Sequence, residues 1–139
     1  MNRQGHDMAN LLPRVTERNR PFWEGCAAGE LRLQCCTDCG TYRYPDSPSC
    51  PQCLSGTASW KPISGRAELW SFAVFHHRYF DEVADRLPYP VLWVKLEEGP
   101  FMITGLDGDV SELEVGQRLE VSFHRVSADR FIPNFKVAR

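Results

Sequence analysis

Hydrophobic and polar positions alternate over much of the second half of the chain, which predicts β-strands. Residues 67–77 form a long stretch rich in β-branched and aromatic side chains, and residues 118–124 alternate cleanly. Shorter strands are predicted at residues 91–96, 101–105 and 131–137. Turns are predicted between them, at residues 97–100 and 107–109. Five short strands with glycine-containing turns favour a small closed barrel of the OB type.

The first half of the chain has a weaker pattern and predicts a short helix ahead of a small β-ribbon. The helix is expected at about residues 17–28, with Gly29 ending it. Two residues can cap its first turn, Thr16 and Asn19. Phe22 and Trp23 form its apolar face, and either the same domain or a partner protein can cover that face. Short strands are expected at residues 30–35, 41–44 and 60–63.

Two pairs of cysteines lie between these strands, in the segments Cys36-Thr-Asp-Cys39 and Cys50-Pro-Gln-Cys53. Ten residues separate the pairs, which is enough for the ribbon to fold back and bring four sulfurs around one ion. Gly40 follows the first pair, where such a turn often needs a positive φ. Four thiolates around one ion are typical of structural Zn²⁺ and leave no open position for a zinc hydrolase. We therefore predict one structural Zn²⁺ per chain, bound by Cys36, Cys39, Cys50 and Cys53.

The same spacing is compatible with other uses of the cysteines. Rubredoxin-type iron takes the same four ligands, and disulfides need no metal. Cys35 can replace Cys36 as a ligand, although the two-residue gap from Cys36 to Cys39 matches the second pair. In an extended strand, Cys35 would point away from the metal. Cys26 lies among small residues and is expected to be a buried, unreactive thiol.

The composition limits what the chain can do. Its 139 residues suffice for one domain or two very small ones, and its 42% of hydrophobic residues suffice for a small core. We expect a disordered tail at residues 1–16, a helix and zinc ribbon at 17–63, and an OB-fold domain at 64–139. Residues 65–139 carry 9 basic and 12 acidic side chains, which argues against nucleic acid as a partner. No secretory or transmembrane stretch is present, so we expect a cytoplasmic protein without a membrane partner.

The order of these parts and the residues within them resemble the DUF35 family, acyl-CoA-associated OB-fold proteins with a rubredoxin-like zinc ribbon. The resemblance covers roughly residues 17–137, and it is carried by the leading helix, both cysteine pairs and a Ser-Gly-Arg junction together. The matching stretches are residues 22–25, 29–33, 36–40, 50–53, 60, 64–66, 89–90 and 115–116. Cys35 departs from the family pattern, in which Arg or Lys is common at this position, and adds a second candidate ligand.

The resemblance implies a protein that is not itself the catalyst. Members of the family generally accompany a thiolase-fold enzyme that makes or breaks carbon–carbon bonds on acyl-CoA or related substrates, and some accompany enoyl-CoA hydratases. We therefore expect an accessory subunit in a hetero-oligomer. It would complete a substrate channel, hold its partner in the active arrangement or pass on an acyl intermediate.

A search for catalytic residues in the chain itself agrees with that expectation. His76 and His77 are adjacent in a predicted strand, so their side chains face opposite ways and cannot bind one ion together. His124 is expected to be solvated at a strand end. We find no Ser–His–Asp arrangement, no phosphate-binding glycine loop and no paired carboxylates. The charged loop at residues 81–90 is a candidate partner contact.

Two binding functions compete with an accessory subunit. A nucleic-acid-binding OB module would expose aromatic side chains interleaved with Lys and Arg. Here the alternation predicts that most of the aromatic residues belong to the core, namely Trp70, Phe72, Phe75, Trp93, Phe101, Phe123, Phe131 and Phe135. A stand-alone acyl-CoA-binding protein would need several cations for the phosphates, and the candidates are Arg78, Arg86, Arg125 and Arg130.

Overall fold

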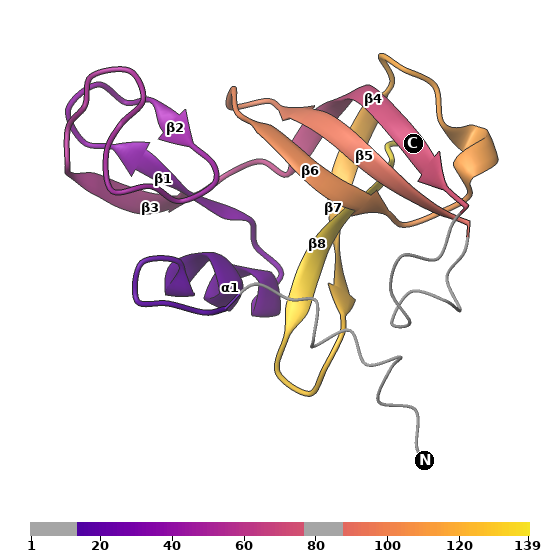
Figure 1. The fold of residues 1–139 in the computed structure, drawn as a ribbon, viewed down its shortest axis with the longest axis horizontal. Helices are drawn as coiled ribbons and strands as arrows, with labels where there is room; N and C mark the ends of the chain where they lie inside the picture. The colour runs from indigo at the N-terminus through magenta and orange to yellow at the C-terminus, as the bar shows by residue number, and fades with distance from the viewer. Residues whose placement is uncertain (1–13, 77–87) are drawn as a thin grey trace.

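The computed structural model describes residues 14–76 and 88–139. These residues form one α-helix, a three-stranded ribbon sheet and a closed five-stranded barrel beside it (Figure 1). The predicted fold class, mainly β with one short helix, is confirmed. Most of the predicted tail at residues 1–16 and of the loop at 81–90 lies outside the described residues.

Helix α1 (Arg20–Ala27) is shorter at both ends than the predicted span of 17–28. Asn19 occupies the N-cap position, but its side-chain oxygen accepts a hydrogen bond from the backbone N–H of Thr16 (2.7 Å) and does not cap the helix. Gly29 follows the last turn with a φ of +79°, the left-handed conformation expected of a glycine that ends a helix. Phe22 is buried in the core, so the chain's own fold covers the apolar face of α1.

The ribbon sheet has β1 (Arg32–Cys36) at its centre, with β2 (Tyr42–Arg43) on one side and β3 (Ala58–Pro62) on the other. Both pairings are antiparallel. Four of the five residues of β1 are buried, so the alternation suggested by its sequence is not reproduced. The reason is that α1 packs against this strand, while Cys36 at its end faces the second cysteine turn.

The barrel contains five strands in the closed order β4-β5-β6-β8-β7. They are β4 (Arg66–Phe75), β5 (Tyr89–Leu96), β6 (Phe101–Leu106), β7 (Arg118–Arg125) and β8 (Phe131–Val137), with the 3₁₀ turn η4 (Val110–Glu112) between β6 and β7. All neighbours are antiparallel except β6 and β8. Each strand overlaps one predicted from the alternation, because in a closed barrel one face of every strand must be apolar.

The barrel interior is filled by side chains that alternate along the strands. The most deeply buried ones are Leu69, Leu92, Val94, Leu96, Met102, Leu119 and Phe135. No helix among the described residues is long and apolar enough to span a membrane.

The ribbon is tied to the barrel at the junction between β3 and β4. Gly65 has a φ of +77°, and a Cβ there would lie 2.5 Å from Cγ1 of Val121, so both the backbone and the packing require glycine. Arg66 donates two hydrogen bonds to the carboxylate of Glu97, at 2.9 and 2.7 Å. The backbone N–H of Ser64 donates to Glu98 Oε2 at 2.9 Å. The turn between β5 and β6 is thereby held against the junction.

Candidate metal centre and exposed aromatic face

The first cysteine turn follows directly from β1. Its backbone closes with a hydrogen bond from the N–H of Gly40 to the carbonyl of Cys36 (3.0 Å). Gly40 has a φ of +78°, as the sequence predicts for this position. The turn places the sulfur of Cys36 near the backbone N–H groups of Asp38 and Cys39.

The second cysteine turn repeats the same geometry. The N–H of Leu54 donates to the carbonyl of Cys50 (2.9 Å), and the N–H of Gln52 donates to Cys50 Sγ (3.3 Å). Leu54 stands where the first turn has Gly40, and its φ of +66° is unusual for a residue other than glycine. This strained position could not be predicted, because leucine is not a residue typical of turns.

The two turns bring all four predicted cysteine sulfurs together, with Cys36, Cys39, Cys50 and Cys53 within 4.8 Å of one another. Cys36 Sγ lies 3.6 Å from Cys53 Sγ, and Cys39 Sγ lies 3.6 Å from Cys50 Sγ. A tetrahedral site with Zn–S bonds of about 2.3 Å separates its sulfurs by about 3.8 Å. The donor set therefore fits Zn²⁺, and all six cysteines are free rather than disulfide-bonded.

The surroundings of the sulfurs favour thiolates at two of the four positions. The backbone N–H of Cys39 lowers the pKa of the Cys36 thiol to about 6, and the N–H of Cys53 lowers the pKa of Cys50. For Cys53 the N–H of Ser55 lowers the pKa, but burial and the neighbouring sulfurs outweigh it and raise the pKa to about 12. Four thiolates this close repel one another, and a divalent cation at their centre relieves that repulsion.

The two remaining cysteines lie apart from this cluster. Cys35 is buried, its thiol donates to the carbonyl of Gly40 at 3.5 Å, and it is not part of the cluster of four sulfurs. Cys26 on α1 is 1% exposed, and burial raises the pKa of its thiol to about 12. Such a thiol stays protonated and inert at neutral pH.

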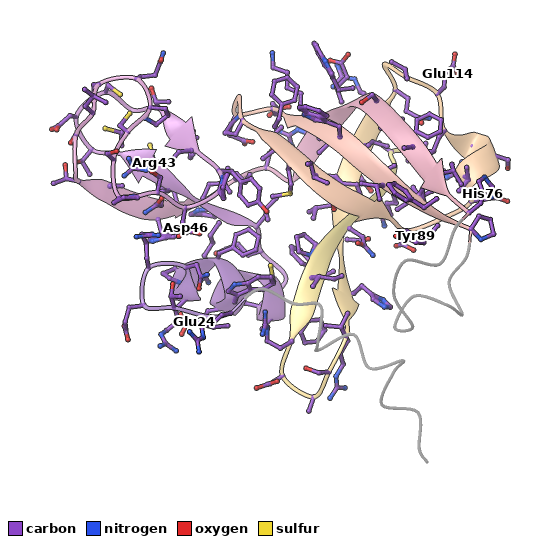
Figure 2. All side chains as sticks on the ribbon, in the orientation of Figure 1. Glu24, Arg43, Asp46, His76, Tyr89 and Glu114 are labelled. Atoms are coloured by element: carbon purple, nitrogen blue, oxygen red, sulfur yellow. The ribbon has the colours of Figure 1, made fainter. Side chains whose placement is uncertain are left out.

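The histidines do not form a site within the described residues. β4 ends at Phe75, so His76 is not a strand residue as predicted; it is exposed at the end of the barrel away from the ribbon (Figure 2). His77 lies outside the described residues, and His124 is exposed on β7. The four cysteines are the one cluster of potential metal ligands found in residues 14–76 and 88–139.

The barrel exposes a group of large apolar side chains that the alternation assigned to the core. Trp70, Trp93 and Phe101 are 48%, 46% and 38% exposed. The core assignment was wrong for these three residues. Leu69, Leu92, Val94 and Met102 point into the barrel, so Trp70, Trp93 and Phe101, which are adjacent to them along the strands, point outward. Phe135, by contrast, is fully buried as predicted.

These residues form a continuous surface across β4, β5 and β6, which we call the aromatic face: Trp70, Trp93, Lys95, Phe101 and Ile103. The Phe101 ring meets the rings of Trp70 and Trp93 edge to face, with centroids 5.3 and 6.0 Å apart. Lys95 Nζ lies 5.6 Å from the Trp70 ring and 5.8 Å from the Phe101 ring. Ile103 is 65% exposed and lies opposite Trp93 in the strand register.

Of the four arginines considered for CoA phosphates, the two that the structure describes contact other parts of the chain. Arg78 and Arg86 lie outside the described residues. Arg125 donates to the backbone carbonyls of Ser127 and Ala128, both at 3.1 Å. Arg130 lies over the Trp23 ring, 4.4 Å from its centroid. Arg125 and Arg130 therefore serve the hairpin between β7 and β8 and its packing on α1.

Comparison with known proteins matches both parts of the chain. The model described as "ChsH2, rubredoxin-like zinc ribbon domain" matches residues 23–58, and "ChsH2, C-terminal OB-fold domain" matches residues 60–124. A "DUF35 domain-containing scaffold protein" of Methanothermobacter thermautotrophicus is 32% identical over 93 residues, covering 66% of this chain and 69% of that protein.

A "probable enoyl-CoA hydratase alpha subunit" of Thermomonospora curvata is 31% identical over 133 residues, which is 92% of this chain. The chain spans only 40% of the length of that relative. Among solved structures, the "Ltp2-ChsH2(DUF35) aldolase" superposes with a TM-score of 0.82 at 28% identity. The superposition covers 92% of this chain and 100% of that chain.

Proposed function

Because the chain belongs to the DUF35 family, in which a zinc ribbon precedes an OB-fold domain, we propose that it is a non-catalytic accessory subunit of an acyl-CoA enzyme complex. Its partner is a thiolase-fold or related acyl-CoA enzyme that makes or breaks carbon–carbon bonds. The chain supports assembly of that complex and passage of the acyl substrate. The similarity to a hydratase alpha subunit and to a chain of an aldolase supports an enzyme complex of this kind.

The observation that carries the proposal is the aromatic face. Monomeric proteins rarely leave a cluster of large apolar side chains in water, and Trp and other aromatic residues are enriched where protein partners bind. The face lies on three neighbouring strands of a rigid barrel, so its shape is fixed before binding. A partner that covers it removes three aromatic rings from water at little conformational cost.

Zinc has a structural role in this proposal, with one ion per chain held by Cys36, Cys39, Cys50 and Cys53. A tetrathiolate site supplies no open coordination position, so the ion contributes folding free energy rather than chemistry. Leu31 and Leu33, which lead into and form the ribbon, belong to the same core cluster as the barrel residues, and closing both cysteine turns on one ion fixes the shape of the far end of the ribbon. The ribbon is then a rigid extension of the barrel for the partner to recognise.

The test is affinity purification of the tagged chain from its native host, with mass spectrometry of the co-purifying proteins. A thiolase-fold or hydratase subunit in stoichiometric amount is the expected result. A variant with Trp70→Ser and Trp93→Ser serves as the matched control and should lose that partner while keeping its zinc. A chain that purifies alone at wild-type zinc content contradicts the proposal.

A further inference from the structure

The outer surface of the barrel carries a row of charged side chains beside the aromatic face. Lys95 on β5 is the cross-strand neighbour of Glu68 on β4, and Glu68 is in turn the neighbour of Arg118 on β7. Cross-strand neighbours point to the same face of a sheet, and all three side chains are exposed. On the other side of Lys95 the row continues to Phe101 of the aromatic face. The charged row therefore adjoins the apolar surface directly.

A pocket of about 400 Å³ opens along this row. It lies across β4, β5 and the start of β7, which are neighbours in the barrel (Figure 1). Gly116 forms part of its wall, and a Cβ at this glycine would have no atom within 4 Å, so the space beside β7 is open. The pocket has an excess of one positive charge, since three cations and two carboxylates line it: Arg66, Lys95, Arg118, Glu68 and Glu97.

The cations of the pocket are not equally engaged. Arg66 donates two hydrogen bonds to Glu97, at 2.9 and 2.7 Å, and these hydrogen bonds hold the pKa of Glu97 below its usual value. The charge of Arg118 acts on that pKa in the same direction, so Arg118 lies within electrostatic reach of the pocket. Neither Lys95 nor Arg118 forms an ion pair with another residue in the described part of the chain. An additional carboxylate can therefore pair with them without breaking an existing ion pair.

We propose that this pocket binds an aspartate or glutamate side chain of the partner enzyme, which pairs with Arg118 and Lys95 at the edge of the aromatic face. The identity of the partner rests on the proposed function, whereas the charge and position of the pocket are independent of it. Protein–protein interfaces combine an apolar core with a polar rim, and charges in the rim fix the orientation in which two proteins bind. The aromatic face supplies the core here, and the pocket supplies the part of the rim that selects an acidic partner surface.

The surrounding charges favour a single carboxylate over a chain of phosphates. Glu68 lies between Lys95 and Arg118 in the row, and Glu97 keeps Arg66 engaged. A phosphate backbone needs several cations along its path, and its further charges would meet these two carboxylates. One carboxylate needs only a single excess positive charge, which is what the pocket has.

The test measures binding of the full, zinc-loaded chain to the partner that it captures, by surface plasmon resonance. Arg118→Glu should weaken binding at least about tenfold, because it removes an attraction and places a like charge opposite the partner's carboxylate. Arg118→Gln only removes the attraction and should weaken binding about two- to fivefold. Both effects should fall mainly on the association rate and shrink at about 1 M salt. Arg20→Glu makes the same charge change at an exposed arginine of α1 and should bind like the wild type.

A zero-length cross-link identifies the side chain that the partner contributes. Arg118→Lys keeps the positive charge and adds a primary amine, which a carbodiimide joins to a nearby carboxylate as an amide, taking up the released water as a urea. Mass spectrometry of the cross-linked complex should find residue 118 or Lys95 joined to an aspartate or glutamate of the partner. The proposal is overturned if Arg118→Glu binds as the wild type does at low salt, or if neither amine is joined to a partner carboxylate.

The same measurements separate this inference from the proposed function. An acyl-CoA enzyme that binds Arg118→Glu as tightly as the wild-type chain leaves the accessory role standing and overturns the pocket. A captured protein of another class whose binding depends on Arg118 supports the pocket and contradicts the accessory role. A wild-type chain that captures no protein overturns both. A fluorescent oligothymidylate that binds the wild-type chain but not Arg118→Glu shows a nucleic-acid site and overturns the proposal of a partner carboxylate.

Discussion

Replacing Trp93 with alanine should weaken partner binding far more than replacing a similar tryptophan elsewhere. Trp93 lies on β5, the middle strand of the aromatic face, and is 46% exposed. An aromatic side chain of this size covers roughly 200 Å², so roughly 90 Å² is left for a partner to bury. At about 25 cal/mol per Å², that area corresponds to about 2 kcal/mol, or about a 30-fold loss of affinity.

The same substitution also destabilises the free chain, because the other half of the ring packs on the barrel. The buried part, roughly 110 Å², contributes at most about 2–3 kcal/mol to the free energy of unfolding. A binding defect must therefore be separated from a folding defect. Trp23→Ala is the matched control, since Trp23 is also partly buried but packs against the core from α1.

The assay measures the affinity of both variants for the captured partner by calorimetry, together with their thermal unfolding. We expect both variants to unfold at lower temperature and only Trp93→Ala to lose affinity. Equal loss of affinity in the two variants would mean that the helix, or stability alone, governs binding. Unchanged affinity of Trp93→Ala at a temperature where it is folded would refute the aromatic face as the partner surface.

Three further changes test the metal centre and the backbone around it. Cys36→Ser and Cys50→Ser should each reduce bound zinc to near zero by elemental analysis, whereas Cys35→Ser should keep it; full retention in both ligand variants would disprove the assignment. Leu54→Asn should raise the free energy of unfolding by about 1 kcal/mol in denaturant titrations, because Asn tolerates the positive φ better and Leu54 buries little surface. Burial raises the pKa of Cys26 from 9.0 to about 12, so the stability from its neutral thiol is complete below pH 9 and lost as pH rises toward 12. In Cys26→Ala, the unfolding temperature should therefore fall less steeply between pH 9 and pH 12 than in the wild type. An equally steep fall in both proteins would count against a buried thiol at this position.

The strands and the grouping of the four cysteine sulfurs could be predicted because their signals are local. A strand of a closed barrel has one apolar face, so β7 (Arg118–Arg125) could be read from alternation nearly to the residue. The two-residue gap within each cysteine pair limits the geometry of the turn. Gly40, directly after the first pair, indicates that this turn ends in a positive φ. The helix boundaries were predicted less accurately than the strands. The side-chain oxygen of Asn19 accepts a hydrogen bond from the backbone N–H of Thr16 and does not cap the first turn of the helix.

The aromatic face and the buried arginine could not be predicted, because both depend on contacts between distant segments. Alternation separates two faces of a strand but does not say which one closes inward, and here the smaller Leu and Val residues occupy the interior. A register shift between Leu69 and Ser71 places Trp70 at an irregularity of β4, which periodicity does not reveal. Arg43 is 4% exposed on the two-residue strand β2, and nothing in its local sequence marks this arginine as buried.

Exposed aromatic rings on an OB barrel also suit single-stranded nucleic acid, so the charge around them decides between the two partners. Lys95 is the one cation of the aromatic face, and it lies over the rings of Trp70 and Phe101. Its cross-strand neighbour is Glu68, which adds a negative charge where a phosphate backbone would run. Binding a strand of phosphates requires several cations along its path, and its affinity falls steeply with salt as counterions compete. The aromatic face instead combines three aromatic rings with a single lysine, which contacts two of those rings and has Glu68 as its cross-strand neighbour. This composition is typical of the core of a protein–protein interface and favours a protein partner.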